Sequence, residues 1–277
     1  EQPSGRIGGD TMADLLVRAR EDENVKAVVV RIDSGGGSAT ASEVISREIE
    51  LTRQAGKPVF VSMGSIAASG GYWIAAPADQ IWATPTTITG SIGIFGAFPT
   101  FEKSLKSLGI TSDGVGTTQL SDAFDPSRPL NELVAQSMNL VIEQGYRRFV
   151  QRVAEGRNMQ PEAVEKIAQG RVWAGITAKD LGLVDNIGSL QDAVDAIAKT
   201  AGLTDYEITY ITQPLTTREL LIKRLNRLIV GIFAALSPTD HPAKRLYDSV
   251  IDTEIDHVLR ADDPVGSYAY CLNCNIQ

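Results

Sequence analysis

The sequence predicts an α/β protein whose strands are buried on both faces. Three observations support this class: short runs rich in β-branched residues, helix-like stretches between them, and glycine-rich turns where two of the runs end. Strands buried on both faces are near-continuously apolar, which is typical of parallel sheets covered by helices. In the first hundred or so residues, the predicted strands are 25–32, 58–63, 81–84 and 91–95.

Helices are predicted from apolar residues spaced three and four apart. The clearest pattern covers 130–153, where Leu130, Leu133, Val134 and Met138 begin a stripe of about six turns. Gly56 provides a stop after the first predicted helix, because glycine readily adopts the left-handed conformation of a helix end. The predicted helices are 41–54, 130–153, 158–170, 175–182 and 189–202.

Composition excludes several classes of function. The 277 residues include 26 basic and 34 acidic side chains, so the chain lacks the basic field that nucleic-acid binding needs. Only two histidines are present, His241 and His257, which nearly excludes a zinc enzyme built on histidine ligands. We therefore expect no metal, no cofactor and no nucleic-acid partner, and any acid–base chemistry must rely on another residue type.

Two glycine-rich turns each follow a predicted strand. They cover 33–38 and 64–73 and belong to the edge of an open α/β sheet where binding sites form. Ser69 lies among small residues, and the amides of the neighbouring glycines are free to bind an oxyanion, as acyl transfer requires. Neither turn has the Gly-Lys-Ser/Thr ending of a phosphate-binding loop. Both turns are equally compatible with a purely structural role as tight strand-to-helix connections.

Several motifs, in order along nearly the whole chain, resemble the signal peptide peptidase A family. They are Asp33-Ser34-Gly35-Gly36-Gly37-Ser38, Met63-Gly64-Ser65-Ile66-Ala67-Ala68-Ser69-Gly70-Gly71-Tyr72-Trp73, Thr89-Gly90-Ser91-Ile92-Gly93, Gln169-Gly170-Arg171-Val172-Trp173 and Gly182-Leu183-Val184-Asp185. The tail from Tyr268 to Cys274 resembles the end of the long, two-domain proteobacterial form. The resemblance implies a ClpP/crotonase-like spiral of ββα units and peptide hydrolysis by a Ser/Lys dyad.

Site residues follow from matching these motifs position by position. The resemblance implies that Ser69 is the nucleophile, that the amides of Gly36 and Gly70 form the oxyanion hole, and that Ser91 orients the base. Residues expected to bind an extended substrate are Gly37, Ser38, Gly71 and Tyr72. One departure is Gly35, where the family usually has proline, so this loop has a freer backbone before substrate binds.

The family's lysine base is missing. Single-domain relatives have it a few residues before a Pro-Ser-Arg segment, and the matching position here is Ser121. Three explanations remain open. The base comes from the N-terminal half of a two-domain protein, or it is another lysine such as Lys57, Lys103 or Lys106, or the domain is inactive and only binds. We favour the first, in which the dyad forms across a domain interface that excludes water and lowers the lysine pKa.

The predicted domains are a peptidase domain over 1–203, whose first strand is expected to lie upstream of this sequence, and an extension over 204–277. The extension is expected to contain a strand at 206–211 and an amphipathic helix at 220–236 that packs on protein or lies on a membrane surface. For Cys271 and Cys274 we expect a structural or incidental pair, because a polar tail does not favour a redox site.

Partners and location follow from the resemblance. It implies a homo-oligomer of four two-domain chains, at the periplasmic face of the bacterial inner membrane, with an upstream anchor. Expected substrates are cleaved signal peptides and small hydrophobic peptides. Two alternatives are an inactive assembly module and an acyl-CoA-handling crotonase relative, the latter disfavoured by the absence of a basic cluster near the two turns.

Overall fold

The structure is a computed structural model that describes residues 7–212. The chain divides into two compact units, one of residues 16–208 and one of residues 1–15 with 209–277. The site lies in the first unit, so the fold is described there. The predicted helix 220–236 and the Cys271–Cys274 pair lie outside the described residues, and the predicted domain boundary at 203/204 stays a prediction.

The described part alternates helices and strands, which confirms the predicted α/β class. In chain order the elements are α1 (Gly9–Glu21), β1 (Val28–Ser34), α2 (Ala39–Gln54), β2 (Val59–Ala68), α3 (Gly70–Ala75), β3 (Gln80–Ala83), β4 (Ile88–Gly90), α4 (Glu102–Ser107), α5 (Glu132–Arg157), α6 (Pro161–Ile167), β5 (Val172–Ala174), α7 (Gly175–Asp180), β6 (Asn186–Ile187) and α8 (Leu190–Thr200).

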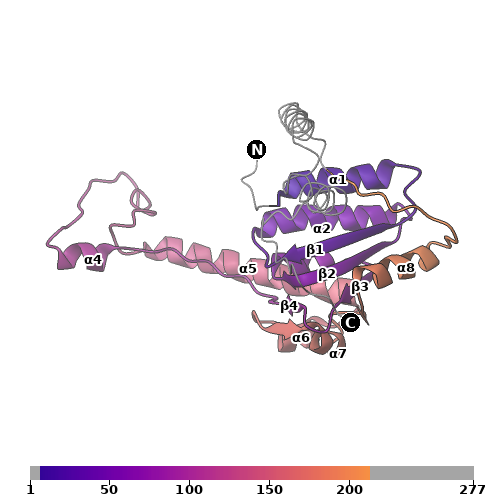
Figure 1. Ribbon diagram of the computed structural model, residues 1–277. Coiled ribbons are helices and arrows are strands. Elements are labelled where there is room, and N and C mark those ends of the chain that lie inside the picture. Colours follow the sequence, from indigo (N-terminus) through magenta and orange to yellow (C-terminus); the bar gives the residue numbers. More distant parts are fainter. Residues whose placement is uncertain (1–6, 213–277) are drawn as a thin grey trace, which may run out of the picture. The chain divides into compact units, whose positions relative to one another are not determined.

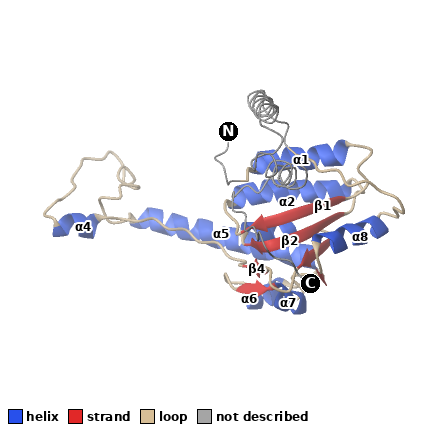
Figure 2. Ribbon diagram, in the orientation of Figure 1, coloured by secondary structure: helices blue, strands red, loops and turns tan. Residues whose placement is uncertain are grey.

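Strand β2 organises the sheet (Figure 2). Residues 59–63 pair in parallel with β1, and after an irregularity Ala67 pairs with Ser34; the first half of β2 also pairs with β3, and its last three residues pair with β4. Because β2 changes partner along its length, the sheet curls instead of extending flat. Strand β5 is antiparallel to β4, and β6 is parallel to β3. Eight of the ten residues of β2 are buried, as expected for a strand covered on both faces.

Helices cover this sheet and are capped by the residues that begin them. The Ser38 hydroxyl accepts the Ala41 amide at the start of α2, and the Asn131 side chain accepts the Leu133 amide at the start of α5. Helix α2 packs against α3, and α8 packs on β1 and β2. Among the largest fully buried side chains of this core are Phe60, Met63, Tyr72, Ile81, Ile92 and Phe149.

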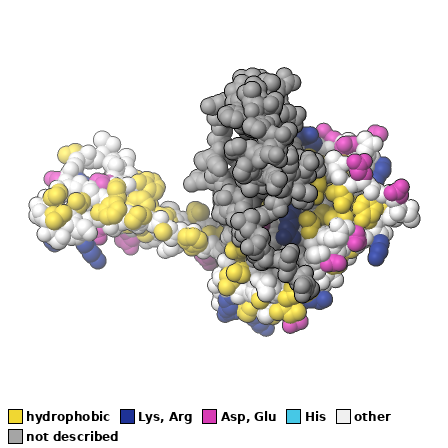
Figure 3. Space-filling view, viewed as in Figure 1, with side chains coloured by type: hydrophobic (Ala, Val, Ile, Leu, Met, Phe, Trp, Pro, Cys, Tyr) yellow, Lys and Arg dark blue, Asp and Glu magenta, His cyan; other side chains and the backbone are white. Residues whose placement is uncertain are grey.

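Residues 95–141 form an arm that extends from the sheet (Figure 1). Helix α4 and the loop after it lie at the end of α5 that points away from the strands. Many apolar side chains of the arm are exposed, and Figure 3 shows them gathered there. They are Phe95, Phe101, Leu108, Ile110, Val115, Leu120, Phe124, Leu133, Leu140 and Val141. Among residues 7–212, no helix combines the length and the apolar character needed to cross a lipid bilayer.

Two predicted strands are wrong. Residues 91–95 are irregular, because Gly90 and Ser91 both have positive φ and the chain turns out of the sheet after β4. Residues 206–211 alternate in polarity but form no strand, since strand pairing needs a neighbouring edge and no described strand pairs with them.

Candidate active site

The two glycine-rich turns lie side by side because the strands before them are neighbours. Ser34 at the end of β1 pairs with Ala67 near the end of β2, so both chains leave the sheet at the same edge. The first turn then leads into α2 and the second, at Ser69, into α3. The prediction that the turns share one edge of the sheet is confirmed.

Ser69 has a backbone conformation that side chains rarely adopt, with φ 52° and ψ −118°. Its amide donates to the Gly90 carbonyl at 2.9 Å, and its carbonyl accepts the Trp73 amide at 2.9 Å. These two hydrogen bonds hold Ser69 in a backbone conformation that is about 1–3 kcal/mol less favourable than the common ones. The side chain is half-buried and does not cap α3. Its hydroxyl has no hydrogen-bond partner within residues 7–212.

Glycine is required where the two turns touch. A Cβ atom on Gly36 would lie 2.7 Å from the Gly70 nitrogen and 2.8 Å from the Ser69 Cβ, closer than real side chains approach. A Cβ atom on Gly70 would lie 2.5 Å from the Ser42 hydroxyl oxygen, and one on Gly71 would lie 2.6 Å from the Ser34 carbonyl oxygen. The turns are therefore interlocked by backbone contacts.

Two backbone amides flank the Ser69 side chain in this interlock. The Gly70 amide has no acceptor within the described part of the chain, as is usual for the first turn of a helix. The Gly36 amide donates to the Ser34 hydroxyl at 3.2 Å, a long bond that a stronger acceptor would replace. An oxyanion next to Ser69 would offer that acceptor to both amides.

Ser91 lies one residue after the carbonyl that holds Ser69. Its amide donates to the Arg171 carbonyl at 2.7 Å, and its φ of 50° turns the chain at the end of β4. The side chain is half-buried, and its hydroxyl has no hydrogen-bond partner in the described ranges. The structure thus brings Ser69, Ser91 and the two glycine turns together.

The residues predicted to bind substrate differ in exposure. Gly37 and Ser38 are exposed in the first turn, with the Ser38 hydroxyl occupied as the cap of α2. Gly71 is buried, and Tyr72 is fully buried with its hydroxyl donating to the Leu183 carbonyl at 2.8 Å. Burial raises the pKa of the Tyr72 hydroxyl. Any contact of Gly71 or Tyr72 with a peptide would therefore involve the backbone.

None of the lysines that lie nearest to Ser69 in the sequence contacts its side chain. Lys57 precedes β2 and Ser69 follows it, which separates them by about 30 Å of strand. The Lys57 amine donates to the carbonyls of Ala19 and Asp22, at 2.9 and 2.6 Å. Lys103 and Lys106 are exposed on α4, in the arm. No lysine amine of the described residues is hydrogen-bonded to Ser69 or Ser91.

Ser121, which matches the family's lysine position, also lies far from Ser69. The Gln119 carbonyl accepts the Asn131 side chain at 2.8 Å, which ties this loop to the start of α5. The other end of α5 meets the site, where the Phe149 ring lies 4.6 Å from the Trp73 ring. Phe149 follows Asn131 by 18 positions, which corresponds to about 27 Å of helix.

Sequence reasoning missed two residues behind the site. Glu43 accepts the Trp73 indole N–H at 2.7 Å and an Arg152 N–H at 2.6 Å. Glu43 follows the first glycine-rich turn by five residues, and a carboxylate at the start of the next helix was the available signal. Arg152 is on α5, more than 100 residues away in sequence, and nothing local indicated it.

Fold and site together define an α/β protein with a half-buried serine, held at positive φ, beside two interlocked glycine turns, an arrangement suited to acyl transfer. Residues 51–204 match peptidase family S49. The chain belongs to peptidase family S49.

Individual relatives agree with this assignment. Protease 4 of Salmonella typhi is 44% identical over 275 residues, covering 99% of this chain and 44% of the relative. The chloroplastic serine protease SPPA of Arabidopsis thaliana is 31% identical over 256 residues, covering 91% and 37%. The chain thus spans less than half the length of these relatives. Among solved structures, a ClpP1 mutant from Listeria monocytogenes is similar with a TM-score of 0.43 and 18% identity, covering 67% of this chain and 86% of that one.

Proposed function

We propose that this chain is the serine-bearing half of a peptidase that hydrolyses peptides with a Ser/Lys dyad. The observation that carries the proposal is the contact between Gly36 and Gly70 around Ser69. This contact supports a site in which Ser69 attacks a substrate carbonyl group while two backbone amides bind the oxygen of that carbonyl. Membership of a peptidase family agrees with this reading.

The proposed reaction begins when the Ser69 oxygen attacks the carbonyl carbon of a peptide bond, and its proton passes to a neutral lysine amine. The negative charge on the carbonyl oxygen is stabilised by the Gly36 and Gly70 amides. The intermediate then breaks its C–N bond, and the leaving amine takes the proton back from the lysine. Water hydrolyses the resulting ester in the same way and frees Ser69. Ser91 is proposed to orient the lysine amine.

We propose that the lysine comes from the N-terminal half of a two-domain protein. The position of Ser121 supports this idea, since the matching position of a related domain would also lie on an arm, separated from the residues packed beside its own serine by about 27 Å of helix. A lysine on such an arm serves a neighbouring domain. We further propose that four such two-domain chains form the oligomer and that an upstream segment anchors them at the periplasmic face of the inner membrane. Residues 1–203 are proposed as the peptidase domain.

An apolar groove supports hydrophobic peptides as substrates. It has a volume of about 560 Å³ and begins at Ile94, three residues after Ser91. One wall follows Ser91 along the chain, and the other is formed by α5 and the arm loop. Its lining includes Ile94, Phe95, Leu120, Phe124, Leu133, Val134, Met138, Val141 and Ile142. Cleaved signal peptides, which have an apolar core segment, match this chemistry.

A fluorophosphonate probe tests the proposal, because it forms an ester with an activated serine. We expect Ser69 to be labelled in the complete gene product that contains this chain and to be labelled far more slowly in residues 1–277 alone. Ser69→Ala is the control for the labelled site, which mass spectrometry identifies. Equal labelling with and without the upstream half would contradict the borrowed lysine. No labelling in either form would favour an inactive binding domain.

A further inference from the structure

The two turns of the site are followed by helices that a single carboxylate connects. Glu43 is on α2, five residues after the Ser38 cap, and Trp73 is on α3, four residues after Ser69. The indole N–H of Trp73 donates to the Glu43 carboxylate at 2.7 Å. This bond therefore joins the helix that follows Gly36 to the helix that begins at Gly70.

Trp73 is well placed to transmit that connection. Its side chain is 2% exposed, its ring packs on Phe149 with centroids 4.6 Å apart, and its backbone amide donates to the Ser69 carbonyl at 2.9 Å. A buried indole with a charged acceptor and a ring partner has little freedom to move. The orientation of α3 at the site is thereby coupled to Glu43.

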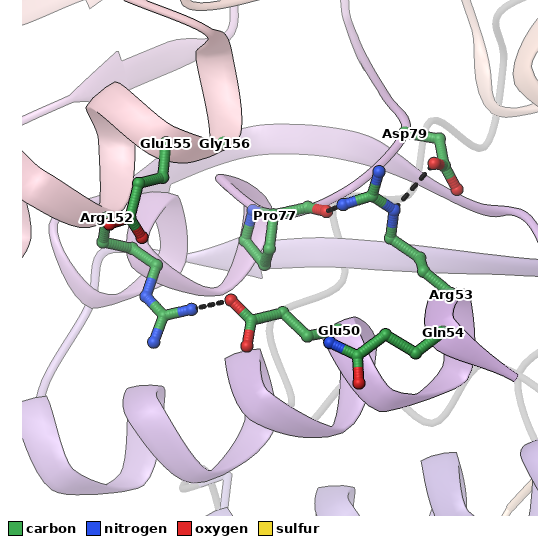
Figure 4. A pocket seen from close by; sticks show the side chains of 8 residues that line it. All are labelled: Glu50, Arg53, Gln54, Pro77, Asp79, Arg152, Glu155 and Gly156. Atoms are coloured by element: carbon green, nitrogen blue, oxygen red, sulfur yellow. Dashed lines mark hydrogen bonds and ion pairs between the residues drawn. The ribbon is translucent and has the colours of Figure 1, made fainter.

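Arg152 in turn holds the Glu43 carboxylate. One N–H of its guanidinium donates to Glu43 at 2.6 Å and another to Glu50, two turns further along α2. Figure 4 shows Arg152 reaching from α5 to Glu50 at the wall of a charged cavity. The Arg152 side chain is only 13% exposed, whereas the side chains of Glu43 and Glu50 are 34% and 24% exposed, so the ion pairs are buried mainly on the arginine side.

We propose that Glu43, held by Arg152, is a positioning residue for the oxyanion hole. This inference rests on the proposed function. The two proposed donors, Gly36 and Gly70, belong to different segments, and only their relative placement decides whether both reach one oxygen. Errors of about 1 Å in such placement cost about a hundredfold in rate. The Glu43–Trp73 bond limits that error directly behind the two turns.

The test measures, in the complete gene product, the rate constant for fluorophosphonate labelling of Ser69 and kcat and KM for a peptide. For Glu43→Ala we expect labelling and kcat to fall about tenfold, with KM changed by less than about twofold. Trp73→Phe keeps an aromatic side chain, smaller than the indole, but loses the N–H donor, and we expect a similar fall. The double variant should be no slower than Glu43→Ala alone, because both changes remove one interaction.

Two further variants separate positioning from loss of stability. Glu43→Gln retains an oxygen acceptor for Trp73 and should recover labelling to within about threefold of the wild type. Glu48→Ala removes an ion pair between the same helix, α2, and Arg20. The side chains of this pair are also largely buried, but Glu48 makes no hydrogen bond to α3 among the described residues. It should lower Tm and leave the labelling rate unchanged.

Each outcome has one meaning. Labelling of Glu43→Ala at the wild-type rate, or an equal loss in Glu48→Ala, would overturn the positioning role while the proposed function stands. A wild-type protein that is not labelled at Ser69 would refute the proposed function and this inference with it.

Discussion

Gly36 and Gly70 are in different turns, yet a Cβ atom on Gly36 would lie 2.7 Å from the Gly70 nitrogen. Gly36 also has a φ of 106°, which side chains rarely adopt. The residue is thus held both by the space around it and by its backbone conformation. Because the Ser69 Cβ is equally close, the same contact fixes the candidate nucleophile relative to both amides.

Replacing Gly36 by alanine should therefore disable the site. A methyl group there must push the two turns apart, which displaces the Gly70 amide, and we expect labelling of Ser69 to fall at least about a hundredfold. Gly35→Ala is the matched control in the same turn, since its Cβ would make an ordinary 3.5 Å contact with Ile66. Similar labelling rates for the two variants would show that the contact is not needed.

The strained backbone of Ser69 is expected to lower the free energy of unfolding of the protein. Replacement by glycine removes the strain of its positive φ, whereas alanine keeps it, so Ser69→Gly should be more stable than Ser69→Ala by about 1 kcal/mol. Chemical denaturation measures the difference, and neither variant should be labelled. If both variants unfold at the same denaturant concentration, the conformation is not strained.

The apolar groove should govern affinity for peptides without affecting the serine. Val141 lines the groove, and a charge there would have to lose water when an apolar side chain binds, so Val141→Asp should raise KM for hydrophobic peptides about tenfold. Labelling by a small fluorophosphonate should not change. Leu140→Asp is the control, because Leu140 is similarly exposed on the same helix and does not line the groove. Equal effects of both charges would assign the effect to the arm as a whole.

Local patterns were enough to predict the longer strands and five of the helices, whereas the short strands β4, β5 and β6 and the helices α1, α3 and α4 were missed. The apolar run of β2 and the periodicity of α5 both reflect burial, which the sequence of one segment encodes directly. Residues 91–95 look equally like a strand, but pairing depends on a neighbour, and the positive φ of Ser91 takes them out of the sheet. That turn depends on tertiary contacts, including the Ser91 bond to Arg171.

For the candidate site, too, only the features encoded within single segments could be predicted. Ser69 and the two glycine turns follow from motifs within single segments, and strand order then brings them together. The Glu43–Arg152 pair spans 109 residues, and Arg152 is one of several arginines on α5 with nothing local to distinguish it. Contacts of this kind become visible only when the packing of α2 against α5 is known.

Because of Tyr72, the free energy of unfolding should fall as the pH rises above about 10. Burial raises its pKa above the ordinary 10.0, so above pH 10 the unfolded chain loses a proton that the folded protein keeps. Unfolding is then favoured as pH rises, with a contribution of about 1.4 kcal/mol per pH unit from this residue, and there is no contribution below pH 10. Tyr72→Phe removes that slope and costs about 1 kcal/mol at neutral pH through the lost hydrogen bond to Leu183. Tyr146, whose pKa is also raised by burial, is present in both proteins, so its effect cancels in the difference. Denaturant titrations from pH 7 to 11 measure both slopes, and parallel curves would mean that Tyr72 ionises without unfolding the protein.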